Sequence, residues 1–261
     1  MAKHKAKGSN SNFKKTILIL LLIICICSII LFIKIKASES IDNNKQKEIS
    51  QIIDTIDIPK EDITPVQNER MLKVAELKKT NNDIIGWIEI AGTNINYPVL
   101  QGQDNEYYLN HTYTKEKVKG GSIFLDKDYD FNKPSENLLI YGHRNTKGLM
   151  FEDLINYKNQ DYYTQHPTIR FTTSKEDNEY EIISAFNSRV YYQDETNVFR
   201  YYYFVNAESI SDYKDYVNNV KQASLYDTGK TAIYGDQLLT LSTCDYSQKN
   251  GRFAVVAKKV K

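Results

Sequence analysis

An uncharged apolar stretch near the N-terminus is the strongest constraint on what this chain can fold into. No charged residue occurs from Thr16 to Ile33, a run of 18 residues (33 − 16 + 1), and a membrane-spanning helix needs about 17–25. The preceding residues 1–15 contain five lysines and no acidic residue. Because cytoplasmic flanks carry excess Lys and Arg, we expect a basic cytoplasmic tail at 1–15, a single transmembrane anchor at 16–36 and the remainder outside the cell.

A cleaved signal peptide is the competing interpretation of the same stretch. Its apolar core would be shorter, about 7–15 residues, and would be followed by a small-x-small cleavage site. The stretch is followed instead by KIKAS at 34–38, which does not resemble such a site. The sequence therefore favours an uncleaved anchor in the cell membrane.

Composition narrows the classes of function. The net charge of +1 gives no reason to expect nucleic acid as a partner. Of the three cysteines, Cys25 and Cys27 lie inside the apolar stretch, which leaves Cys244 as the one cysteine outside it. We therefore do not expect a fold held together by disulfide bonds. The chain lacks Cys-x-x-Cys, His-Glu-x-x-His, an acidic calcium loop and a glycine loop for phosphate. We therefore expect neither a metal nor a cofactor.

Two helical patterns precede the main domain. Residues 37–66 form a polar juxtamembrane stalk, in which one amphipathic helix is indicated by isoleucines at i, i+3, i+4 and i+7, namely Ile49, Ile52, Ile53 and Ile56. Pro59 and Pro65 then interrupt the helix. A second helix is expected over 67–79, with Met71, Val74 and Ala75 on one face. We expect one extracellular domain over 67–261, beginning with this helix.

From about residue 84 the chain alternates between short β-type runs and turn residues. Eight such strands are typical of a closed barrel or a sandwich, so we expect a mainly β domain with peripheral helices. The expected strands are 84–90, 95–101, 121–126, 137–143, 168–174, 179–190, 237–244 and 252–260. Helical insertions are expected at 149–157 and 207–225, the second with a stripe of Ile210, Tyr213, Val217 and Val220.

The cysteine outside the apolar stretch ends a strand pattern, in the sequence TLSTC at 240–244. With a period of two, Thr240, Ser242 and Cys244 share one face of that strand. A small polar face suits the edge of a groove better than a core. The lone thiol is a candidate nucleophile, whereas the alternative role of a free cysteine is that of a small buried hydrophobe.

A basic side chain is expected close to that thiol. Arg252 opens the last strand pattern, eight positions after Cys244 (252 − 244). A fixed cation favours the thiolate and can hydrogen-bond a developing oxyanion. The competing role of Arg252 is that of a surface arginine in a salt bridge.

A histidine would complete such a site as general acid and base. His143 is the best placed of the four, because it ends a strand pattern after Gly142, a residue that would allow a sharp turn. His111 is the second candidate. His166 precedes a proline and has the character of a turn residue, and His4 lies in the cytoplasmic tail.

These residues together resemble the active site of sortases, the membrane-anchored cysteine transpeptidases of Gram-positive bacteria. The resemblance rests on TLSTC at 240–244, Arg252 eight residues later, His143 in YGHRN and the N-terminal anchor, and it extends from about 81 to 261. The segment NNDIIGWIEIAGTNINYPVLQGQDNEYYLNHTY at 81–113 is similar to class B sortases in particular. The resemblance implies an eight-stranded sortase barrel with peripheral helices.

The resemblance also implies a reaction. Cys244 would attack the threonine carbonyl of a pentapeptide sorting signal at the C-terminal end of a secreted protein. His143 would protonate the leaving amine, and Arg252 would hold the substrate carbonyl or the oxyanion. The thioacyl-enzyme would pass its acyl group to an amine of peptidoglycan or of its lipid-linked precursor. The thioester stores the energy that the new amide bond requires.

The family resemblance leaves the substrate and two residue roles open. Class B members often cleave NPQTN-like signals, and others accept LPXTG-like signals. Thr243 is a candidate for positioning the substrate or the oxyanion, and Asp245 is a candidate for assisting the histidine. The alternatives to cell-wall anchoring are a cysteine peptidase that uses water, a pilus-assembling transpeptidase and a non-catalytic binding domain. Hydrolysis is also expected as a side activity of the transpeptidase.

Overall fold

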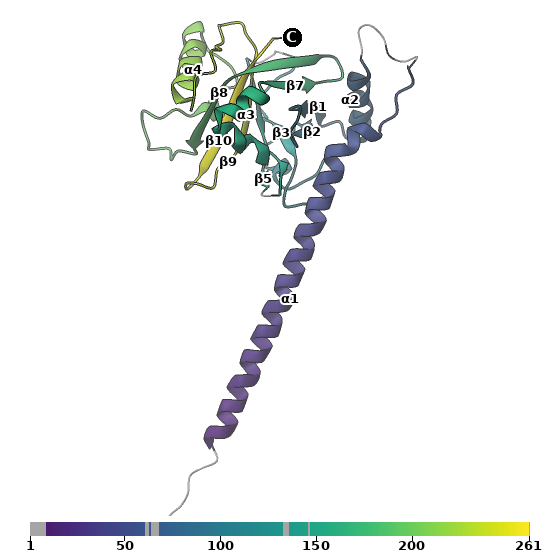
Figure 1. Cartoon of the computed structure of the whole chain (residues 1–261), viewed down its shortest axis with the longest axis vertical. Helices are drawn as coiled ribbons and strands as arrows, with labels where there is room; N and C mark the ends of the chain where they lie inside the picture. The colour runs from purple at the N-terminus through teal and green to yellow at the C-terminus, as the bar shows by residue number, and fades with distance from the viewer. Residues whose placement is uncertain (1–8, 61–62, 64–67, 133–135, 146, 261) are drawn as a thin grey trace, which may run out of the picture. The chain divides into compact units, whose positions relative to one another are not determined.

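The computed structural model describes residues 9–60, 63, 68–132, 136–145 and 147–260 (Figure 1). The chain divides into two compact units, Met1–Asn44 and Lys45–Lys261. Residues 1–8 of the expected basic tail, and parts of the expected stalk, lie outside the described residues. The second unit contains all the described strands, and it begins within the segment that the sequence assigns to the stalk.

The long helix α1 (Ser9–Gln51) contains the apolar stretch. Its large hydrophobic side chains from Ile17 to Ile33 are exposed, and in a water-soluble protein such a surface would be buried. Within the part of the chain that the structure describes, this is the one helix long and apolar enough to cross a membrane. Helix α1 is therefore a candidate membrane anchor.

Eight strands form a closed barrel, which confirms the predicted fold class (Figure 1). Their order around the barrel is β1-β2-β3-β4-β9-β10-β8-β7. The strands are β1 (Ile84–Glu89), β2 (Asn96–Leu100), β3 (Ile123–Leu125), β4 (Asn137–Tyr141), β7 (Thr168–Thr172), β8 (Asp177–Arg189), β9 (Leu238–Cys244) and β10 (Gly251–Lys259). Each of the eight expected strands corresponds to one of these.

Two parallel pairings join segments that are distant in sequence. Strand β2 pairs with β3 and β4 pairs with β9 in parallel, whereas the other neighbours around the barrel are antiparallel. Parallel strands need a long connection, and the chain between β4 and β9 contains β7, β8 and four of the described helical segments. The buried core includes Ile88, Val99, Ile140 and Val255. Strands that are distant in sequence therefore contribute to one hydrophobic core.

The small polar face of β9 is largely buried, unlike the open groove edge that the sequence predicted. The Thr240 hydroxyl donates to the side-chain oxygen of Asn137 at 2.8 Å and lies 3.3 Å from the hydroxyl of Tyr216. The Ser242 hydroxyl lies 2.7 Å from that of Tyr201. Both tyrosines come from the β8–β9 connection, in η5 (Tyr201–Tyr203) and α4 (Ile210–Ala223). Because each of these hydroxyl groups has a hydrogen-bond partner, its burial carries no large cost in free energy.

The part of α1 that follows Asn44, together with η1 and α2, belongs to the same compact unit as the barrel. At the end of α1, the buried Gln46 side chain donates to the Gly121 carbonyl at 2.8 Å. Helix α1 is followed directly by the short 3-10 helix η1 (Ile52–Thr55), in which Ile53 is buried. Helix α2 (Glu69–Thr80) begins after Asn68, whose side chain accepts from the Met71 N–H at 3.0 Å. Capping by asparagine satisfies one of the free donors of the first turn.

The helices expected at 67–79 and at 149–157 differ from the structure. The helix expected at 67–79 begins at Glu69, with residue 67 outside the described part, and it buries Leu77 where Ala75 was expected. The helix expected at 149–157 is instead the short strand β6 (Leu149–Met150), which pairs with β5 (Arg144–Asn145), and the 3-10 helix η4 (Glu152–Lys158). Met150 adopts a φ of 57°, which no α-helix tolerates.

The remaining helices are α3 (Gln160–Gln165), which the sequence pattern did not predict, the 3-10 helix η3 (Tyr107–Leu109), and α4. Helix α4 lies within the expected range 207–225. Its Tyr213, Val217 and Val220 are buried as expected, but Ile210 is 52% exposed. Ile210 is the first residue after the Ser209 cap, where the helix has not yet reached the core.

Candidate active site

The parallel register of β4 and β9 brings His143 and Cys244 to the same end of the barrel. Each residue of β9 is numbered 101 higher than its β4 partner, as for Tyr141 and Ser242 (242 − 141). At the same offset, His143 corresponds to Cys244 (244 − 143). The sequence could not reveal this register, because it is set by a pairing across the whole β4–β9 connection.

Gly142 links the ends of the two strands. Its N–H donates to the Ser242 carbonyl at 3.1 Å, and its carbonyl accepts from the Thr243 hydroxyl at 2.8 Å. A Cβ atom at this position would lie 2.4 Å from the Ile123 side chain and 2.6 Å from that of Phe151. Its φ is outside the left-handed region. Glycine is therefore required for close packing, rather than for the sharp turn that the sequence suggested.

Arg252 lies directly across from Cys244. It is the second residue of β10 and the cross-strand partner of the cysteine, and directly opposed residues have Cβ atoms about 4.5–5.5 Å apart on one face. The half-buried guanidinium donates to the Gly251 carbonyl at 3.0 Å through Nη1. Among the residues that the structure describes, it forms no ion pair with a carboxylate. Its other donors are therefore available to a ligand.

The side chains of His143, Cys244 and Arg252 line one pocket of ≈ 270 Å³. It is lined by apolar and aromatic side chains around a few polar groups, as binding sites usually are. The lining residues are Asn105, Leu109, Phe124, Tyr141, Gly142, His143, Val190, Tyr201, Tyr202, Ser242, Thr243, Cys244 and Arg252. A larger pocket of ≈ 580 Å³ is lined by other residues, among them Lys78, Glu176 and Lys259, and its lining includes neither a cysteine nor a histidine.

His143 is held through one of its ring nitrogens. Nε2 lies 2.8 Å from the carbonyl oxygen of Leu109, another residue of the pocket. Because a carbonyl can only accept, Nε2 carries the hydrogen in this bond. The other nitrogen, Nδ1, is then the one that can exchange a proton with a neighbour. The thiol of the half-buried Cys244 makes no hydrogen bond within the described residues.

The two candidate accessory residues differ in their surroundings. Thr243 lines the pocket, but its hydroxyl is committed to the Gly142 carbonyl. Asp245 has a buried side chain that accepts from Lys158 Nζ at 2.7 Å and from the Ser247 N–H at 3.0 Å. Burial would raise the pKa of Asp245, but these hydrogen bonds outweigh it and hold the pKa below the ordinary value. Asp245 does not line the pocket.

The other histidines lie outside the pocket lining. The His111 ring stacks on that of Tyr107 with centroids 4.1 Å apart, and its Nδ1 is 2.8 Å from the Tyr107 carbonyl. His166 caps the C-terminus of α3, with Nδ1 2.8 Å from the Ala91 carbonyl. His4 is outside the described residues. Within the described residues, no group of three or more His, Cys, Asp or Glu side chains could hold a metal ion.

Two tyrosines of the pocket were not identified from the sequence. Tyr141 ends β4 and donates to Asp126 at 3.0 Å. Burial is the largest cause that raises the pKa of Tyr141, and the nearby Asp126 carboxylate raises it further. Burial also raises the pKa of Tyr201 to about 12, although its hydrogen bond with Ser242 opposes the shift. Both phenols are therefore neutral at physiological pH. Only the period of β4 could have indicated Tyr141, and no local signal marks Tyr201.

Comparison with known proteins identifies the family. The model of the sortase domain matches residues 88–260. The chain belongs to the sortase family. The sortase is 36% identical to sortase B of Listeria monocytogenes serovar 1/2a over 199 residues, which cover 76% of this chain and 78% of the relative. Sortases are cysteine transpeptidases, and the relatives assign this one to class B, as the sequence motifs predicted.

Solved structures agree with this assignment. The Staphylococcus aureus sortase B–substrate complex matches the sortase with a TM-score of 0.68 and 27% identity, covering 88% of this chain and 99% of that chain. A sortase B complexed with triglycine matches with a TM-score of 0.68 and 28% identity, covering 87% of this chain and 98% of that chain. Sortases of this class thus share the eight-stranded barrel found here.

Proposed function

We propose that this sortase cleaves a pentapeptide sorting signal after its threonine and transfers the protein to an amine of peptidoglycan or of its lipid-linked precursor. The observation that carries the proposal is the convergence of Cys244, His143 and Arg252 on one pocket from the ends of β9, β4 and β10. A nucleophile, a proton donor and an anion-stabilising group are the three parts that acyl transfer through a thioester requires.

The first half-reaction forms a thioester. The Cys244 sulfur attacks the threonine carbonyl, and Arg252 donates hydrogen bonds to the oxygen as it becomes negative. The C–N bond then breaks, and His143, which carries the proton lost by the Cys244 thiol, gives it to the leaving amine through Nδ1, since Nε2 is bonded to Leu109. The released peptide carries a new N-terminal amine, and the substrate acyl group remains on the sulfur.

The second half-reaction transfers that acyl group. An amine attacks the thioester carbonyl, the C–S bond breaks, and the thiolate leaves with Arg252 again facing the oxyanion. His143 takes the proton from the attacking amine and restores the starting state. A bound substrate in one sortase B structure and triglycine in another support a peptide donor and an amine acceptor for this enzyme. When no amine is present, water serves as a slower acceptor.

Helix α1 supports a location at the membrane. Its uncharged apolar stretch follows the five N-terminal lysines, so the positive-inside rule orients the N-terminus toward the cytoplasm and the barrel toward the exterior. Sorting signals and peptidoglycan amines are met on that outer side. We therefore propose a single-pass membrane enzyme with an extracellular catalytic domain.

The transpeptidase proposal can be tested with the full-length enzyme in detergent. It is mixed with a pentapeptide library that includes NPQTN and LPXTG sequences, with and without triglycine, and the products are identified by mass spectrometry. We expect a product in which triglycine is joined to the threonine at the C-terminal end of the acyl fragment. We also expect a thioacyl adduct in the mass spectrum of the intact enzyme. Cys244→Ala should form neither. Hydrolysis products alone, across triglycine and a panel of other amines, would overturn the assignment in favour of a peptidase.

A further inference from the structure

A charged network lies directly beside the candidate catalytic residues, and it includes the residue that follows each of His143 and Cys244 along the chain. Arg144 follows His143 and Asp245 follows Cys244. The β4–β9 offset of 101 also relates this second pair (245 − 144). Arg144 Nη1 lies 3.9 Å from Asp245 Oδ1. The contact therefore joins the two chain segments one residue beyond the pair that performs the proposed chemistry.

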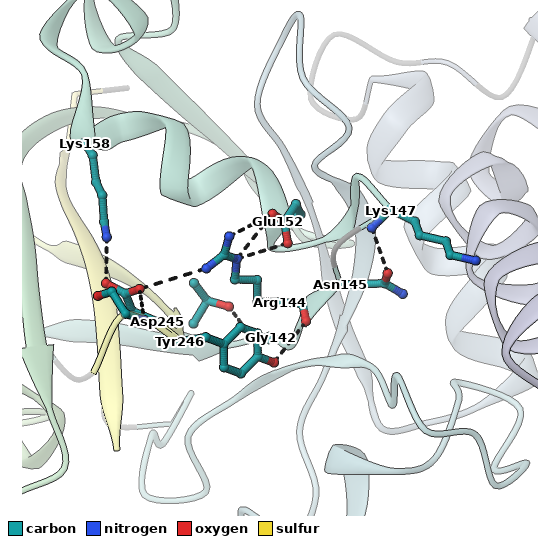
Figure 2. Close-up of polar contacts among 10 residues, drawn as sticks. Gly142, Arg144, Asn145, Lys147, Glu152, Lys158, Asp245 and Tyr246 are labelled. Atoms are coloured by element: carbon teal, nitrogen blue, oxygen red, sulfur yellow. Dashed lines mark hydrogen bonds and ion pairs between the residues drawn. The ribbon is translucent and has the colours of Figure 1, made fainter. Parts of the chain in front are cut away.

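The network contains two positive and two negative groups (Figure 2). Arg144 donates through Nε and Nη2 to Glu152, each at 3.2 Å, and Lys158 donates to Asp245 at 2.7 Å. Glu152 and Lys158 are the first and last residues of η4, so this 3-10 helix spans the two charged contacts. The Asp245 side chain is 1% exposed. A buried carboxylate is tolerated only when it is paired in this way.

Tyr246 adds two contacts to the same arginine. Its hydroxyl lies 3.3 Å from the Arg144 carbonyl, and the Arg144 guanidinium lies 5.5 Å from its ring centroid. Figure 2 shows Arg144 between Glu152, Asp245 and the Tyr246 ring. The residue after His143 is thus attached to both residues that follow Cys244. Because the peptide unit is planar, moving the Arg144 backbone would also move His143.

We propose that Arg144 is a positioning residue that sets His143 relative to Cys244 through its contacts with Asp245, Tyr246 and Glu152. Asp245 acts on the histidine through Arg144, rather than by accepting a hydrogen bond from its ring. The observed contacts support this route, since the recorded ring bond of His143 is to Leu109 and the side-chain partners of Asp245 are Lys158, Arg144 and Ser247. The inference rests on the proposed catalytic roles of His143 and Cys244.

The test compares Arg144→Gln with Arg170→Gln in the full-length enzyme. Arg170 forms an ion pair with Asp177 on the β7–β8 hairpin and does not line the pocket, so it is a matched control for loss of one arginine pair. Peptide cleavage, the pH profile of kcat/KM, the pH dependence of Cys244 alkylation by iodoacetamide, and Tm are measured for each. Alkylation needs no peptide substrate and reports on the thiol directly.

We expect Arg144→Gln to lower kcat about ten- to hundredfold with little change in KM, because small misplacements of reacting groups carry losses of this order. The pH profiles of cleavage and alkylation should shift with it. Arg144→Lys should restore part of kcat, since it keeps the charge but loses the planar fork. The double variant Arg144→Gln/Asp245→Asn should lose little more than Arg144→Gln alone, because both act through one network.

Two results would overturn the proposal. One is an Arg144→Gln enzyme whose Tm falls while kcat and both pH profiles stay like those of Arg170→Gln, which would make the network purely structural. If Arg144→Gln does not fold, the same criterion applies to Arg144→Lys and Asp245→Asn. The other is full additivity of the Arg144 and Asp245 losses. Normal turnover of His143→Ala would instead refute the proposed function itself, so the two failures are distinguishable.

Discussion

Two arginines near Cys244 differ in what surrounds them. Arg252 faces the pocket and makes one hydrogen bond, to a backbone carbonyl, with no carboxylate partner among the described residues. Arg144, one residue beyond His143, is bonded to Glu152, lies close to Asp245 and covers the Tyr246 ring. The two guanidiniums have the same chemistry, yet one keeps free donors and the other has its donors engaged by protein groups.

The same division separates neighbouring residues in the two strand ends. The Cys244 thiol has no hydrogen-bond partner in the described part of the chain, whereas the Asp245 side chain is buried and bonded to Lys158 and Ser247. The residue that follows each reactive group along the chain is a charged one, and its charge is paired within the protein, Arg144 with Glu152 and Asp245 with Lys158.

The largest effect on the pocket side should come from the histidine. His143→Ala should lower kcat by about 10²–10⁴-fold, the usual contribution of a general acid and base. His111→Ala should remain close to the unchanged enzyme, since its ring stacks on Tyr107 outside the pocket lining. The two variants are compared by single-turnover peptide cleavage with triglycine. Equal losses from both would contradict the assignment of His143.

The next effect should come from the unpaired arginine. Arg252→Lys should lower kcat by about 10²-fold, because loss of an oxyanion donor has an effect of this order, and a lysine does not reproduce the planar fork. Arg170→Lys is the control, since Arg170 is already bonded to Asp177. Steady-state kinetics of both variants measure the difference. A nearly normal kcat for Arg252→Lys would remove the role of the guanidinium fork.

The smallest effect should appear on the paired side, as a change of stability with pH. The pKa of Asp245 is lowered in the folded protein, so its stabilising contribution is complete above the unfolded pKa of about 3.9 and is lost as pH falls through the lower folded value. Thermal unfolding of the wild type and Asp245→Asn between pH 7 and 2.5 should show a Tm difference that narrows with acid. A constant difference would mean that the Asp245 charge does not contribute.

Local sequence patterns were sufficient to predict most helices and strands, but not which of these elements pair or pack together. Short β-type runs separated by turn residues predicted all eight barrel strands, and uncharged length predicted α1 as a candidate anchor. Helix 149–157 was wrong because the left-handed backbone at Met150 and the β5–β6 pairing override an apolar pattern. The polar face of β9 was expected to be open, and the tyrosines that cover it come from segments more than 20 residues away.

The sequence by itself determined which chemical groups this sortase has: one cysteine outside the apolar stretch, an arginine eight residues later and few histidines to choose from. Tertiary structure alone decided which of them meet. The parallel pairing of β4 with β9 joins chain segments 101 residues apart, and it places His143 in the same pocket as Cys244 and Arg144 close to Asp245. Side-chain alternation acts over neighbouring residues, whereas a strand register and a buried ion pair form only when distant segments pack together.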